Sequence, residues 1–180
     1  MTHSVVFDAL GVPFQRRGAL TDDYLRAVRS AWDDDEDYRS GRIPIWVGGN
    51  SDAGLRRAVR LGEAWHPLPC TLPWLRDALD RLKAIADEQG RPVPALAPRT
   101  PLRLTESPID DSGRLAGEGT IDQVVDDLEQ LRLLGADTVL LDPFNGDRAE
   151  THRPEVAWRA LATVADCWDL GTPLARSERR

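Results

Sequence analysis

Apolar residues recur at helical spacing in five stretches of the chain. The clearest begins at Thr120, where Thr and a Gln three residues later form a capping-box pattern ahead of apolar residues spaced three and four apart. Gly135 closes that stretch. The others begin with Ser, Thr or Pro, which suit a helix N-terminus. The predicted helices cover residues 21–32, 51–61, 71–90, 120–135 and 154–168.

Short apolar runs lie between these helices. Residues 138–141 form a continuous apolar run, as expected of a parallel strand that is covered on both faces. Further strand candidates are residues 43–47, residues 101–104 and a weaker run at 64–66. Strands that alternate with helices imply βαβ units, so the predicted fold class is α/β with a parallel sheet of about four strands.

Two polar stretches separate these elements. Residues 33–42 are acidic and end in Ser-Gly-Arg, and residues 105–119 have almost no apolar content. A loop as long as the second is either functional or mobile. We expect one domain over residues 1–180, with a helical lead-in and linker at 1–41, βα units at 42–170 and a disordered tail at 171–180.

Charge and composition narrow the function classes. The net charge of −7 argues against non-specific binding to nucleic acid and to an anionic membrane surface. No apolar run is long enough to span a bilayer, and the N-terminus lacks a signal-peptide pattern, so we expect a cytoplasmic protein. Cys70 and Cys167 are isolated thiols, which predicts neither a disulfide framework nor a metal site.

The sharpest chemical signal is the turn after the strand at residues 43–47. Gly48 and Gly49 allow positive φ angles and close backbone approach, and Asn50 or Ser51 would cap the next helix. Backbone N–H groups at such a turn form an anion site, for which phosphate is the usual ligand. The alternative is an ordinary tight βα turn. Arg56, four residues before Arg60, would help to hold a phosphate or would belong to a solvated face.

Other polar residues lie at the ends of predicted strands. His66 would face the mouth of a barrel as a weak catalytic candidate, or serve as a hydrogen-bonded structural histidine. Arg99 and Arg103 flank a strand and would reach an anionic cofactor or lie in solvent. Asp142 would cap the following turn or line the mouth. No other catalytic motif is present in the sequence.

The segment IPIWVGGNSDAGLRRAVRLGEAWHP resembles the luciferase-like monooxygenase family, in particular its branch that uses the deazaflavin coenzyme F-420. The similarity continues upstream through FDALGVPFQRRGALTDDYLRAVRSAW and downstream through GTIDQVVDDLEQLRLLGADTVLLDPFNGD. The resemblance implies an eightfold βα (TIM) barrel and an oxidoreductase that transfers hydride to or from a small organic substrate. It implies that F-420 or FMN binds with its phosphate at the loop from Gly48 to Ser51, with Arg56 and Arg99 as further contacts.

The match covers only the second half of the family's barrel. The strands that carry the family's main catalytic groups have no counterpart here, so the catalytic residues are unknown and enzymatic activity is an open question. Half a barrel leaves open sheet edges and an apolar face. We expect a homodimer that completes the barrel, or a partner chain that supplies the front half; the third possibility is a remnant without function. The alternative function is a non-catalytic flavin- or phosphate-binding assembly module.

Overall fold

The computed structural model of the protein describes residues 3–35, 43–144 and 149–168. They group into two compact units. Unit 1 lies within residues 1–66 and 81–95, and unit 2 within residues 67–80 and 96–180. The expectation of a single domain over residues 1–180 stays a prediction, and the expected disordered tail at 171–180 is outside the described residues.

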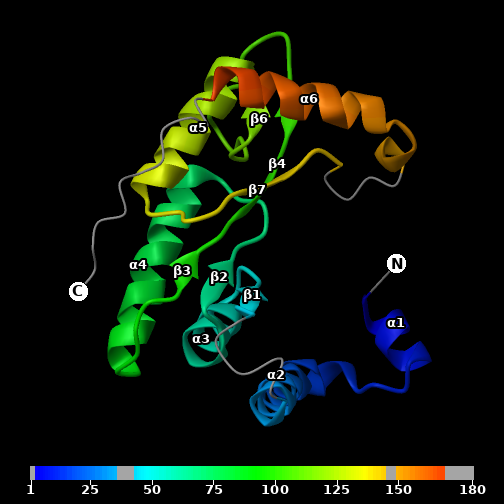
Figure 1. The fold of residues 1–180 in the computed structure, drawn as a ribbon, viewed down its shortest axis with the longest axis vertical. Coiled ribbons are helices and arrows are strands. Elements are labelled where there is room, and N and C mark those ends of the chain that lie inside the picture. Colours follow the sequence, from blue (N-terminus) through cyan, green and yellow to red (C-terminus); the bar gives the residue numbers. More distant parts are fainter. Residues whose placement is uncertain (1–2, 36–42, 145–148, 169–180) are drawn as a thin grey trace. The chain divides into compact units, whose positions relative to one another are not determined.

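In unit 1, α3 (Asp52–Leu61) lies against two parallel strands and α2 (Arg17–Asp34) packs on α3 (Figure 1). Its elements in chain order are α1 (His3–Ala9), the 3-10 helix η1 (Phe14–Arg16), α2 (Arg17–Asp34), β1 (Trp46–Gly48), α3 (Asp52–Leu61), β2 (Ala64–His66) and the C-terminal part of α4 (Leu72–Glu88). β1 and β2 pair in parallel, and the three-stranded sheet has the order β1-β2-β3, where β3 is Ala95–Leu96.

The core of unit 1 lies where α3 packs on the two strands. Leu55, Ala58 and Val59 form the apolar face of α3 and are buried. Val47 and Trp65 are buried partners on neighbouring strands, in register with each other. Burial of these side chains provides the main hydrophobic stabilisation of this unit.

Unit 2 contains two further parallel strand pairs and the C-terminal helices. Its remaining elements are β4 (Arg99–Pro101), β5 (Arg103–Leu104), β6 (Glu118–Gly119), α5 (Ile121–Leu133), β7 (Leu140–Asp142), η2 (Glu150–His152) and α6 (Pro154–Cys167). β4 pairs with β7 and β5 pairs with β6, both in parallel. α5 and α6 pack on each other.

The predicted α/β class with parallel strands is confirmed. Within the described residues the strands form three small sheets and no closed barrel. Completion of a half-barrel by another chain stays a prediction. The predicted helices are all present, although α2 begins at Arg17, four residues earlier than Thr21.

The long polar stretch at residues 105–119 is held in place by a buried ion pair. Arg114 donates to both carboxylate oxygens of Asp127 on α5, at 2.6 and 2.9 Å, and the Gly117 N–H donates to the same carboxylate at 2.8 Å. Asp127 is 1% exposed. The segment also contains β6, which pairs with β5, and the buried residue Ala116.

Candidate functional site

The loop between β1 and α3 combines a glycine of positive φ with a capped helix start. β1 ends at Gly48, and Gly49 has φ of +118°, a region that other residues rarely adopt. Ser51 is the N-cap of α3: its backbone is extended and its hydroxyl accepts from the Gly54 N–H at 3.2 Å. The predicted helix start is therefore confirmed. The first-turn N–H groups of α3 lack intrahelical acceptors, as in any α-helix.

Gly54 brings the first turn of α3 close to this loop. A Cβ atom there would come within 3.2 Å of the Gly49 carbonyl oxygen, so a larger residue would push the loop and the helix apart. A Cβ on Gly49 would meet nothing within 4 Å. Gly49 is thus required for its φ angle and Gly54 for close packing. Gly54 could not be recognised from the sequence, where it occupies an ordinary helical position.

Trp65 fixes the orientation of one peptide group in the loop. Its indole Nε1–H donates to the Gly49 carbonyl at 3.0 Å, and its side chain is fully buried. Because a trans peptide directs its C=O and N–H oppositely, the Asn50 N–H points away from the indole. Trp65 is therefore both a core residue and a support for the loop.

His66 lies beside the loop at the end of β2. It is the register partner of Gly48, and its ring centroid is 5.8 Å from that of Trp46. Trp46 is 41% exposed, whereas Val47 and Trp65, on the opposite face, are buried. The face of β1 and β2 that carries Trp46 and His66 is thus the face turned away from α3.

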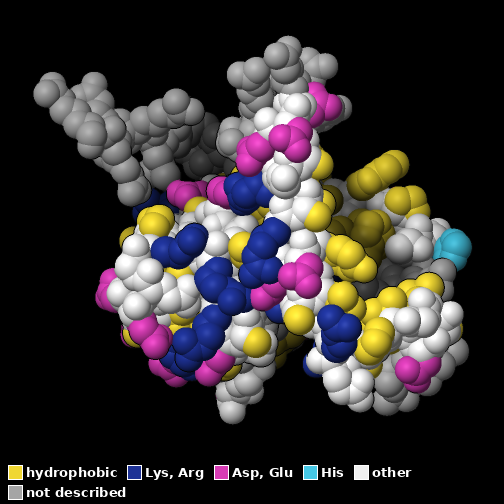
Figure 2. Space-filling view, turned by 90° about the horizontal axis from the view of Figure 1, so that it is seen from below, with side chains coloured by type: hydrophobic (Ala, Val, Ile, Leu, Met, Phe, Trp, Pro, Cys, Tyr) yellow, Lys and Arg dark blue, Asp and Glu magenta, His cyan; other side chains and the backbone are white. Residues whose placement is uncertain are grey.

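The arginines of α3 are held in ion pairs. Arg56 lies 3.3 Å from Glu88 on α4, and Arg60 pairs with Asp22 on α2. Figure 2 shows acidic side chains among the basic ones on the face that it displays. A phosphate at the loop would have to compete with Glu88 for Arg56.

The arginines near the predicted seventh strand belong to unit 2. Arg99 donates from Nε to Asp142 Oδ2 at 3.1 Å, and Arg103 lies 3.9 Å from Glu118. The other carboxylate oxygen of Asp142 accepts from the Phe144 N–H at 3.1 Å, so Asp142 caps the turn after β7. The place of Arg99 relative to the loop at residues 48–51 stays a prediction.

The family of this chain is established by its similarity to known proteins. The sequence model of one family, luciferase-like monooxygenase, matches residues 2–108, which is more than half of the chain. The chain belongs to the luciferase-like monooxygenase family. Uncharacterised proteins of Mycobacterium tuberculosis and Mycobacterium bovis are 28% identical to it over 135 residues, which is 66% of this chain and 46% of each relative. The chain thus spans about half the length of these curated relatives.

Solved structures show the same fold at low sequence identity. The F-420-dependent tetrahydromethanopterin reductase of Methanopyrus kandleri aligns with a TM-score of 0.50 at 15% identity, over 68% of this chain and 49% of that one. An F-420-dependent secondary alcohol dehydrogenase in complex with an F-420–acetone adduct aligns at 0.54 and 14%, over 79% and 63%. The EDTA monooxygenase of Chelativorans aligns at 0.52 and 17%, over 90% and 64%. The α/β fold with parallel strands is therefore that of luciferase-like enzymes.

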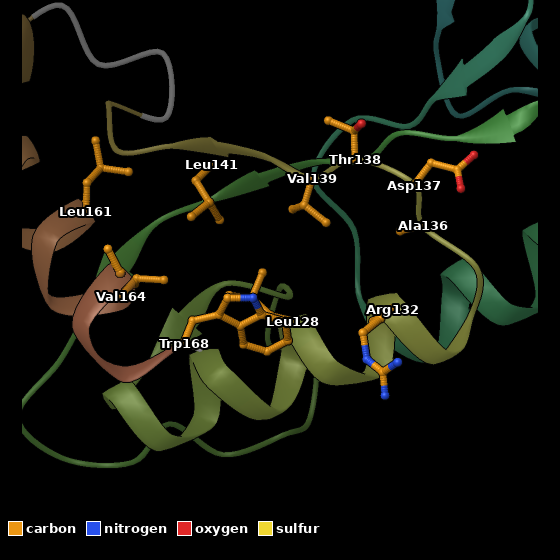
Figure 3. A pocket seen from close by; sticks show the side chains of 11 residues that line it. Leu128, Arg132, Ala136, Asp137, Thr138, Val139, Leu141, Leu161, Val164 and Trp168 are labelled. Carbon is orange, nitrogen blue, oxygen red and sulfur yellow. The ribbon is translucent and has the colours of Figure 1, made fainter. Parts of the chain in front are cut away.

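This family member also has an apolar cavity in unit 2, of about 560 Å³ (Figure 3). Leu128 and Trp168 lie on one side of it and Val139 and Leu141 on the other, with Arg132 near one end. The cavity lies between β7 and the helices α5 and α6. Its polar lining consists of Arg132, Asp137 and Thr138, and no glycine turn at a helix start contributes to it, so it is a weaker candidate for binding a phosphate than the loop at residues 48–51.

Candidate metal ligands and thiols are the remaining groups of chemical interest among the described residues. No group of three or more His, Cys, Asp or Glu side chains there could hold a metal ion. Cys70 is half-buried and Cys167 is exposed, and both are free thiols. Burial raises the pKa of Cys70 to about 11, which makes its thiol unreactive near neutral pH. Among the described helices, none combines the length and apolar composition that crossing a membrane requires.

Proposed function

We propose that this chain is the phosphate-side part of a flavin-type oxidoreductase, and that Gly48, Gly49, Asn50 and Ser51 hold the phosphate end of coenzyme F-420 or FMN. The observation that carries the proposal is the φ of +118° at Gly49, directly before a helix capped by Ser51. Phosphate groups commonly bind where backbone N–H groups point out of a helix start, which supports this assignment. Two neighbours of the same fold are F-420-dependent by description.

The residues present fit such a group. The space around Gly49 is open, and Gly54 keeps the helix start close to the loop. When bound, the flavin or deazaflavin ring supplies the hydride chemistry, and the protein binds and orients it. His66 is the register partner of Gly48, and in this proposal it would donate to a ring or substrate carbonyl. Arg56 would be a secondary contact, since it already pairs with Glu88. The cofactor contact expected of Arg99 stays a prediction.

The substrate is a small organic molecule. Two strand residues with large apolar side chains stay partly exposed, Trp46 at 41% and Leu140 at 42%. Exposed apolar side chains of this kind favour contact with another protein surface. We assign this contact to a second copy of the chain or to a chain that carries the front half of a barrel, in the cytoplasm.

Titration tests the proposed loop directly. Purified protein is titrated into F-420 and into FMN while cofactor fluorescence is recorded. We expect saturable binding of at least one of them, because the loop offers a preformed phosphate site. Turnover of the reduced cofactor with an organic acceptor would support an oxidoreductase, and saturable binding without turnover would support a binding module instead. No saturation with either cofactor would contradict the proposal.

A matched pair of glycine variants separates binding from folding. Gly49→Val forces a branched side chain into a φ of +118° and into the phosphate space, so affinity should fall by roughly tenfold or more. Gly90→Val makes the same change at a second positive-φ glycine, with φ of +59° and no neighbour within 4 Å. It should lower stability and leave cofactor affinity unchanged. Equal affinities of the two variants would refute the role of the loop.

A further inference from the structure

Helix α2 contacts the rest of unit 1 through polar groups. No described side chain from Val6 to Asp35 is fully buried. α2 is tied to α3 by the Asp22–Arg57 ion pair and by the Arg57 guanidinium, which donates to the Gly18 carbonyl at 3.1 Å. Arg29 lies 2.6 Å from Glu63 just beyond α3. One face of α2, through residues 18, 22 and 29, is therefore the face turned toward α3.

The opposite face carries a continuous heptad-type stripe. Its positions are separated alternately by three and four residues, the spacing at which side chains line one side of a helix in a coiled coil. Tyr24 in its centre is 63% exposed. The stripe consists of Arg17, Leu20, Tyr24, Ala27, Ala31 and Asp34.

The ends of α2 carry charges opposite to those that a helix favours. Arg16 and Arg17 stand at its N-terminal end, and Asp33, Asp34 and Asp35 at its C-terminal end. A helix dipole stabilises acidic groups at the N-terminus and basic groups at the C-terminus. This arrangement therefore weakens α2 on its own, and an antiparallel helix with the same charges would offset it at both ends.

We propose that α2 packs antiparallel against α2 of a second copy of this chain. The stripe is symmetric about a point between Leu25 and Arg26, so a two-fold axis there makes it complementary to itself. Arg17 then faces the partner's Asp34, and Leu20 faces the partner's Ala31. Tyr24 faces the partner's Ala27.

Both size and charge match in this arrangement. A large side chain opposes an alanine at each apolar level, which lets the two helices approach closely. The charged ends pair twice, once at each end of the interface. A single helix pair is smaller than a standard interface, so monomer and dimer should exchange at roughly micromolar concentration. This surface does not include the loop at residues 48–51 or the exposed strand residues Trp46 and Leu140.

Sedimentation of the full chain over a wide concentration range tests the proposal. We expect a dimer whose dissociation constant rises with salt, since its ends are charged. Asp34→Arg should weaken it by about tenfold or more, because two ion pairs become repulsive. Asp33→Arg is the matched control: it makes the same charge change one residue away, off the stripe, and should have a much smaller effect.

Recovery of the dimer by a charge swap is the decisive result. Arg17→Asp alone is not sufficient, because Arg17 also stacks on the Phe14 ring at 3.9 Å and its loss perturbs the start of α2. Arg17→Asp combined with Asp34→Arg should restore the dimer, and Arg17→Asp combined with Asp33→Arg should not.

Ala27→Trp should abolish the dimer while circular dichroism stays unchanged, because residue 27 is exposed in the monomer. A wild-type monomer at all concentrations would overturn the proposal. A dimer that is indifferent to all these changes would do the same and would place the interface elsewhere.

Discussion

Replacing Asp127 by Ala should strongly destabilise unit 2, because the Asp127 carboxylate is buried in an ion pair. The Asp127 carboxylate accepts two bonds from Arg114 and one from the Gly117 N–H, and it raises the pKa of Arg114 above its usual range. Removal leaves a guanidinium that is 10% exposed without its main partner. Breaking one side of a buried ion pair costs about 3–5 kcal/mol, and the lost N–H bond is part of the same network. We therefore expect a loss of about 4 kcal/mol.

Urea unfolding followed by circular dichroism measures this loss. With a slope of about 2 kcal/mol per molar urea, the midpoint should fall by about 2 M. Asp111→Ala is the matched control, because Asp111 also pairs with Arg114, at 3.0 Å, but is 85% exposed; it should cost less than about 1 kcal/mol. Adding Arg114→Met to Asp127→Ala should recover part of the stability. A loss below about 1 kcal/mol for Asp127→Ala would contradict the stabilising role of its ion pair with Arg114.

Three further predictions follow from single contacts. Burial opposes ionisation of Asp22, but Arg57 and Arg60 lower its pKa below 3.8 overall. The ionised Asp22 carboxylate therefore stabilises the fold above about pH 4. This stabilisation is lost as the pH falls through the lowered pKa of Asp22. Asp22→Asn should therefore be less stable near neutral pH and show a weaker loss of stability between about pH 5 and about pH 3, measured by thermal unfolding. Gly54→Ala should lower cofactor affinity several-fold with little change in the urea midpoint, since helix propensity rises while the loop is displaced. Cys70 should react with iodoacetamide near pH 8 more than about tenfold slower than Cys167, which peptide mass spectrometry can follow.

The candidate site was predictable because its signals are local in sequence. The strand that ends in Gly48, the glycine with positive φ and the cap at Ser51 all lie within a few consecutive residues. The helices were predictable for the same reason, since the capping box at Thr120 and the apolar period behind it need no tertiary information.

Other features depend on contacts between distant residues. β3 and β6 have two residues each, which is too short for any period to appear. The ion pair of Arg114 with Asp127 and the support of the Gly49 carbonyl by Trp65 join segments more than ten residues apart. Gly54 was missed because its role is set by the backbone of the loop opposite, which the sequence does not display. The ion pairs of Arg56 with Glu88 and of Arg99 with Asp142 also join distant segments, and the cofactor contacts expected of both arginines stay predictions.

We propose that the loop at residues 48–51 holds the phosphate end of a flavin-type cofactor, and isothermal titration of F-420 and FMN can decide this. The wild type, Gly49→Val and Gly90→Val are measured side by side. We expect saturable binding to the wild type and to Gly90→Val, and an affinity at least about tenfold lower for Gly49→Val. Binding that is equal in all three proteins, or absent from the wild type, would contradict it.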